Sequence, residues 1–128
     1  MTGNRPRPTD AELEILTVLW SRGPSTVRDV HEVIAKRRSA QYTTVLKLLQ
    51  IMADKGLVRR DEKQRAHVYE AAYSQELTQK QLAGDLLRRA FGGSATRLMQ
   101  GALSARGASK TELAELRSLL DDYEKGKR

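Results

Sequence analysis

All three prolines of this chain lie at or before Pro24, so residues 25–128 contain no residue that breaks a helix through its own ring. After that point only glycines and short polar clusters interrupt apolar side chains that recur at helical spacing. The length of 128 residues suits one domain with a helical appendage, because two full hydrophobic cores need a longer chain. We therefore expect a mainly helical protein.

Two capping-box patterns predict where the first helices begin. Thr9 precedes Glu12, and Thr26 precedes Asp29, by three residues. At this spacing each side chain accepts a hydrogen bond from the backbone N–H of the other residue. The first helix is expected to end at residues 21–24, where a glycine and a proline follow each other.

A third helix is predicted from its N-cap, Ser39, to about Lys55. Gly56 then supplies the left-handed backbone conformation with which many helices end. Two short β-prone runs follow at residues 57–60 and 67–70, joined by a polar connection that is typical of a hairpin. Three helices followed by a hairpin form the order of a winged helix-turn-helix domain, in which the hairpin is the wing.

Three further helices are predicted after the hairpin, each with one apolar face. Helices that cannot cover such faces within a short segment commonly pair with a second copy of the chain, most often in a twofold dimer. The alternative is that these helices fold back on the first domain. The residues expected to form the dimer contact are Leu82, Leu86, Leu87, Phe91, Leu98, Met99, Leu103, Leu113, Leu116, Leu119 and Leu120.

The predicted fold class is thus mainly α with a small β-hairpin wing. Residues 1–8 are expected to form a flexible basic arm, residues 9–73 a winged helix-turn-helix domain that binds DNA, and residues 74–128 a helical dimerisation module.

The charge distribution points to a polyanionic partner. The formal net charge is +7, and residues 36–65 alone hold nine basic and three acidic side chains. This window runs from the end of the second helix into the wing, where a helix-turn-helix protein meets the phosphate backbone. A solvated basic face without a partner is the alternative reading of the same charges.

The third helix has two distinct sides when its residues are placed about 100° apart. Val45, Leu48, Leu49 and Met52 are expected to face the core, and Ala40, Thr43, Thr44, Lys47 and Gln50 to be exposed. Thr43, Thr44 and Lys47 are the candidate base-reading residues, because threonine and lysine both contact base edges in the major groove. An ordinary polar helix face is the alternative. Ile51 is expected to pack under the wing rather than to contact the groove.

A second set of residues is expected to contact the DNA backbone, which positions a protein without reading sequence. It combines the basic side chains of the wing with polar residues at the starts of the second and third helices, where free N–H groups favour phosphate. Its members are Ser25, Thr26, Arg38, Gln41, Tyr42, Arg59, Arg60, Lys63 and Arg65.

Several function classes are disfavoured. The chain has no cysteine, which excludes disulfides and thiolate metal sites, and its two histidines belong to no nucleophile, metal or phosphate-loop motif. We therefore expect no enzyme activity, no cofactor and no bound metal. The N-terminus lacks the apolar segment of a secretory signal, and no apolar run approaches the roughly 20 residues of a membrane span. A cytoplasmic protein is expected.

Residues 42–49 and 55–58, together with Arg65–Ala66 before the second wing strand, resemble the penicillinase-repressor (BlaI/MecI) family of bacterial winged-helix regulators. Residues 12–20 and 112–116 are similar to that family as well. The resemblance implies a homodimeric repressor that binds a palindromic operator and is released by an inducing signal, often in resistance operons. A winged helix that binds another protein instead of DNA is the rival interpretation.

The chain also departs from the family pattern. Signalled members are cleaved by a sensor-linked protease at an Asn-Phe bond, and Gly101-Ala102 stands at the corresponding place here. Related copper-responsive repressors bind metal through C-terminal cysteines, which this chain lacks. Gln64 replaces a frequent glycine in the wing turn, and Ile51 replaces a frequent arginine.

Overall fold

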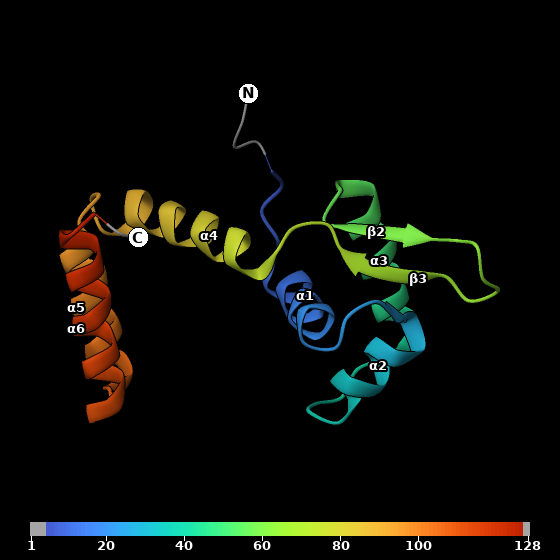
Figure 1. Ribbon diagram of the computed structural model, residues 1–128. Coiled ribbons are helices and arrows are strands. Elements are labelled where there is room, and N and C mark those ends of the chain that lie inside the picture. Colours follow the sequence, from blue (N-terminus) through green and yellow to red (C-terminus); the bar gives the residue numbers. More distant parts are fainter. Residues whose placement is uncertain (1–4, 127–128) are drawn as a thin grey trace. The chain divides into compact units, whose positions relative to one another are not determined.

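The computed structural model describes residues 5–126, and the chain divides into two compact units with the boundary between Leu82 and Ala83 (Figure 1). The elements of the chain are α1 (Asp10–Arg22), β1 (Ser25–Thr26), α2 (Val27–Ala35), α3 (Tyr42–Lys55), β2 (Val58–Asp61), β3 (Val68–Ala71), α4 (Gln75–Ala90), α5 (Ala95–Arg106) and α6 (Lys110–Glu124). The predicted fold class is confirmed: a winged helix-turn-helix is followed by a helical C-terminal segment.

Both predicted capping boxes are present. The Thr9 hydroxyl accepts from the Glu12 N–H at 3.2 Å, and the Glu12 carboxylate accepts from the Thr9 N–H at 2.9 Å. Thr26 and Asp29 form the same reciprocal pair, with both distances at 3.1 Å. The starts of α1 and α2 therefore follow from local sequence, because each cap satisfies backbone donors that the helix itself leaves open.

The start of α3 differs from the prediction. Ser39 is not its cap, since the helix begins at Tyr42 and the preceding Gln41 makes no side-chain capping hydrogen bond. The turn is held from α2 instead: His31 Nε2 lies 2.9 Å from the Ala40 carbonyl, and the His31 ring meets the Tyr42 ring edge-on at 5.7 Å. Ala40, predicted to be exposed, is half-buried against the core.

The end of α3 agrees with the prediction. Gly56 adopts the left-handed conformation with φ 84°, which a side chain would disfavour. The chain then turns directly into the wing.

The hairpin is confirmed, with each strand placed one residue later than predicted, and it lies next to α3 (Figure 1). A third strand, β1, was not predicted. It pairs with β3, so the antiparallel sheet has the order β1-β3-β2. Ser25 and Arg60 both stand opposite Tyr69 in this register. The wing is therefore tied at its base to the residues that begin α2.

One hydrophobic core joins α1, α2, α3 and the sheet. Its buried apolar residues are Ile15, Leu16, Val18, Leu19, Val27, Val30, Ile34, Val45, Leu49, Met52, Leu57, Val58 and Tyr69. Leu48, predicted to be core, is partly buried at its edge. Ile51 is 39% exposed, so the prediction that it packs under the wing is wrong.

In the second unit, hydroxyl groups cap both complete helices. Ser94 accepts from the Arg97 N–H at the start of α5, and Ser109 accepts from the Glu112 N–H at the start of α6. The Glu112 carboxylate pairs with Arg106 instead of returning to its own cap. No side chain that the structure describes in α5 or α6 is fully buried: Leu98, Leu103, Leu113 and Leu116 are partly buried, and Met99, Leu119 and Leu120 are exposed.

A buried ion pair links α1 to the end of α3. Glu12 is only 2% exposed, and both of its carboxylate oxygens accept from Lys55 Nζ, at 2.8 and 2.9 Å. Burial by itself raises the pKa of Glu12, but hydrogen bonds from Lys55 and Thr9 outweigh it and hold that pKa below its ordinary value. The pair therefore stabilises the fold while Glu12 is ionised.

Glu12→Gln is expected to lower the free energy of unfolding at pH 7 by about 2 kcal/mol, because it removes the partner of a partly buried ammonium. The folded pKa of Glu12 is lowered, so its contribution is complete above the unfolded pKa and is lost as the pH falls through the folded pKa. Urea denaturation at a series of pH values should show the two proteins converging below the ordinary glutamate pKa. Asp10→Asn, at an exposed acid in the same turn, is the control. If the unfolding free energies of the two proteins differ by a constant amount down to pH 3, the stabilisation does not depend on the ionised Glu12 carboxylate.

Candidate nucleic-acid interface

The polar side of α3 faces solvent. Thr43, Thr44 and Lys47, the candidate base-reading residues, are all exposed, while Val45 and Leu49 on the opposite side are buried. The helix is therefore anchored by its apolar side and presents short hydroxylated side chains and one ammonium group outward. Such a surface can approach base edges closely in a major groove.

A groove of about 560 Å³ runs between α2, α3 and the wing, and four predicted backbone-contact residues line it. Thr26 comes from the start of α2, Tyr42 from the start of α3, and Arg60 and Arg65 from the wing. The fold thus gathers side chains from three separate parts of the sequence around one concave surface. Sequence reasoning missed Arg28, which also lines it. Arg28 could have been identified from its position in the sequence, because a basic residue in the first turn of a helix opposes the helix dipole and is unfavourable there.

The wing arginines point to different sides of the sheet. Arg60 lines the groove, where the Tyr69 hydroxyl and the Glu62 carboxylate raise the pKa of its guanidinium. Arg59, the preceding residue of the same strand, donates to the Ala72 carbonyl at 3.4 Å. Since neighbouring residues of a strand alternate between its faces, Arg59 does not share the groove with Arg60. Lys63 is exposed in the wing turn.

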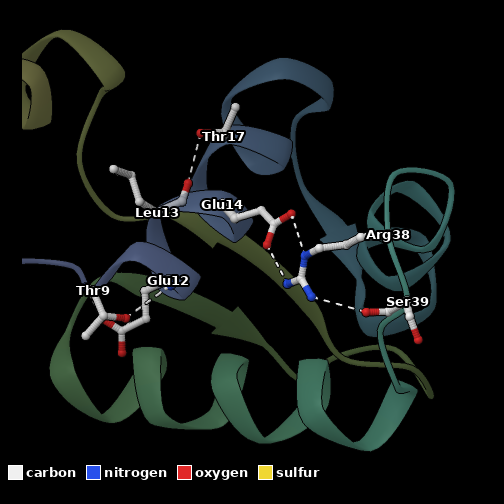
Figure 2. A network of polar contacts seen from close by, with 7 residues as sticks. All are labelled: Thr9, Glu12, Leu13, Glu14, Thr17, Arg38 and Ser39. Atoms are coloured by element: carbon white, nitrogen blue, oxygen red, sulfur yellow. Dashed lines mark hydrogen bonds and ion pairs between the residues drawn. The ribbon is translucent and has the colours of Figure 1, made fainter.

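A smaller hollow of about 230 Å³ lies at the turn between α2 and α3, and Arg38, Gln41 and Thr44 are among its lining residues. The Arg38 guanidinium forms two hydrogen bonds with Glu14, at 2.6 and 3.3 Å, and a third with the Ser39 carbonyl (Figure 2). This pairing lowers the pKa of Glu14 and raises that of Arg38. Arg38 is half exposed, so a phosphate there would share the guanidinium with Glu14.

Two of the base-reading candidates, Thr43 and Lys47, lie between these two concave surfaces, and the third, Thr44, lines the hollow. Tyr42, Leu46 and Gln50 of α3 line the groove, and Gln41, Thr44 and Leu48 line the hollow. At about 100° per residue, Thr43 and Lys47 fall on the exposed strip between the two sets. Ile51 follows Lys47 by four residues and is also exposed on this side. Its apolar surface is therefore available for a contact such as a thymine methyl group.

Ser25 is a correction to the predicted set. Its side chain is 1% exposed, and its hydroxyl donates to the Gly23 carbonyl at 2.8 Å. A phosphate cannot reach a hydroxyl enclosed in this way. The neighbouring Thr26 is only partly buried, and its hydroxyl accepts from the Asp29 N–H at 3.1 Å.

The N-terminal segment also differs from the prediction where the structure describes it. The carbonyl of Arg5 accepts from Gln81, and its guanidinium lies over the Tyr73 ring, so Arg5 is docked and not part of a free arm. The first four residues of the predicted arm lie outside the described residues.

The described part of the chain contains neither a cluster of metal-binding side chains nor a membrane-spanning helix. Residues 5–126 contain no group of three or more side chains that could hold a metal ion. No helix within the same residues is both long enough and apolar enough to cross a membrane.

The three-helix core, the antiparallel wing and the exposed face of α3 define the class of winged helix-turn-helix proteins. Residues 8–122 match the family described as penicillinase repressor. The chain therefore belongs to the penicillinase repressor family, which is a family of transcriptional regulators and not of enzymes.

Individual relatives agree with this membership. Over 82 residues the chain is 40% identical to the transcriptional regulator BlaI of Mycobacterium tuberculosis, covering 63% of the chain and 59% of that protein. The chain thus spans less than two thirds of that regulator. It is 19% identical over 115 residues to the penicillinase repressor of Staphylococcus aureus, covering 90% of the chain and 91% of that protein.

Proposed function

We propose that this protein is a sequence-specific, DNA-binding transcriptional repressor that acts as a homodimer on a twofold-symmetric operator. One observation carries the proposal: the exposed polar strip of α3 lies beside a groove lined by arginines of the wing and of α2. Family membership supports a regulatory role. Thr43, Thr44 and Lys47 read bases, and Thr26, Tyr42, Arg60 and Arg65 hold phosphates around them.

The homodimer is proposed from the second unit. The described apolar side chains of α5 and α6 are incompletely covered within one chain: Met99, Leu119 and Leu120 are 42%, 49% and 63% exposed. An identical chain offers a matching apolar set under twofold symmetry. Two copies would also double the positive surface presented to DNA. A palindromic operator follows from this symmetry, since each protomer reads one half-site. We further propose that the operator controls a resistance or stress-response operon and that the protein acts in the cytoplasm.

Selection from random duplexes, followed by binding at several salt concentrations, tests the proposal. The recovered sequence should be an inverted repeat, and the logarithm of the binding constant should fall linearly with the logarithm of salt concentration because phosphate contacts release counterions. If no duplex is enriched, or if binding does not respond to salt, the repressor assignment fails. A winged helix that recognises only another protein would give that result.

Lys47→Ala and Arg60→Ala should affect binding differently. Loss of a base contact at Lys47 should weaken the selected operator by about 10- to 100-fold and relax preference at one base pair. Loss of a phosphate contact at Arg60 should weaken all duplexes about equally and reduce the salt slope by about one. Titration of the operator and of a scrambled duplex separates the two effects. Lys110→Ala, which removes a charge from the second unit, is the control. If the Lys47 and Arg60 variants behave alike, the division into a base-reading residue and a phosphate-binding residue is wrong.

A further inference from the structure

The junction between β3 and α4 is held at successive backbone groups. The Ala72 N–H donates to the Leu57 carbonyl at 2.9 Å, and the Ala72 carbonyl accepts from Arg59. The next carbonyl, that of Tyr73, accepts from the indole N–H of Trp20 at 3.0 Å. A segment whose polar groups are bound in this way is a structural joint and not a free linker.

The N-terminal segment closes over the same junction. The guanidinium carbon of Arg5 lies 5.8 Å from the centre of the Tyr73 ring, within the range of a cation–π contact. The carbonyl of Arg5 accepts from the Gln81 side chain at 2.9 Å, across 76 residues of sequence. Arg5 Nε is shielded from solvent and has no hydrogen-bond partner among the described residues, so the aromatic ring is its compensating neighbour.

These contacts hold the beginning of a long helix. The first compact unit includes α4 as far as Leu82, and Thr78 on this part of the helix is only 5% exposed. The helix continues to Ala90 in the second unit. Contacts on its first two turns therefore hold the start of the helix that leads into the second unit.

We propose that Arg5, Trp20 and Gln81 are positioning residues that lock the first two turns of α4 onto the winged helix and thereby narrow the range of half-site spacings that the dimer accepts. This inference rests on the proposed function, because a half-site spacing exists only for a dimer on DNA. The lock itself is a property of the free protein and can be measured without DNA.

Hydrogen exchange of the free protein tests the lock. Arg5→Ala combined with Gln81→Ala should reduce the protection of the amides of residues 75–82 by about tenfold, because one cation–π contact and one hydrogen bond are lost. Protection of the α3 core amides should not change. Lys80→Ala combined with Gln79→Ala removes the same charge and the same amide from exposed neighbouring positions, and it serves as the control. Unchanged protection at residues 75–82 would overturn the lock.

Binding to a set of spaced duplexes tests the consequence. Two copies of the half-site recovered by selection are placed at centre-to-centre spacings that increase by single base pairs over one helical turn of about 10 base pairs. The parent protein should bind one spacing best. The Arg5→Ala, Gln81→Ala variant should bind the unfavourable spacings about tenfold better relative to the best one, while its affinity for a single half-site stays the same.

The two failures can be told apart. A variant with the parent spacing profile and the parent half-site affinity overturns the inference and leaves the repressor function intact. A parent protein that binds no duplex overturns the proposed function and the spacing role together, and hydrogen exchange still decides whether Arg5 and Gln81 hold α4. A loss of single half-site affinity in the variant would show a direct DNA contact and would also overturn the positioning role.

Discussion

Replacing Leu120 by glutamate is expected to make the protein monomeric and to lower its affinity for a two-half-site operator by about 100-fold or more. Leu120 is 63% exposed within one chain, so a charged side chain there costs the fold of the protomer little. In a twofold dimer the charge appears twice in the contact and loses its water. Sedimentation and operator titration measure both effects, because the second half-site is bound effectively only while the protomers stay linked.

Ser118→Glu provides the matched control, since it introduces the same charge at an exposed polar position of the same helix. This variant should remain dimeric and keep operator affinity within a few-fold. If the Leu120→Glu protein still sediments as a dimer at micromolar concentration, the apolar face of α6 is not the contact between protomers. Folding back of the C-terminal helices would then be the better explanation for their apolar faces.

Local features of this fold could be predicted from the sequence because each depends on residues close together in the chain. The capping boxes at Thr9 and Thr26, the glycine exit at Gly56 and the wing hairpin are all of this kind. The exposed side of α3 was also predictable, because helical periodicity separates Thr43 from the buried Val45.

Features that depend on distant residues could not be predicted. β1 has only two residues, too few for any alternating pattern, and it exists because β3 pairs with it. The start of α3 depends on His31 in another helix, which holds the Ala40 carbonyl. Ser25 has a typical phosphate-binding side chain by type, but the sheet and the Gly23 carbonyl enclose it. In each case a tertiary contact overrode a local preference.

The excess of basic residues in the window 36–65 does not all face a partner, because Arg38 pairs with Glu14 and Lys55 with Glu12, two acids from outside that window. Lys55 in particular serves the fold. The positive surface that remains beside α3 is therefore narrower than the sequence count implies, and Arg65 belongs to it. A narrow basic surface favours a defined register on DNA over diffuse attraction.

Leu49→Ala is expected to lower the free energy of unfolding by about 3 kcal/mol, a large part of the roughly 5 to 15 kcal/mol that keeps a domain folded. Leu49 has no exposed surface and anchors the middle of α3 in the core, so its truncation leaves a cavity under the recognition helix. Gln50→Ala, one residue further on the exposed side, should change stability by less than about 0.5 kcal/mol. Urea denaturation of both variants measures the difference. Equal losses would show that the two sides of α3 are not divided into core and interface, and the DNA-reading role of the polar side would lose its structural basis.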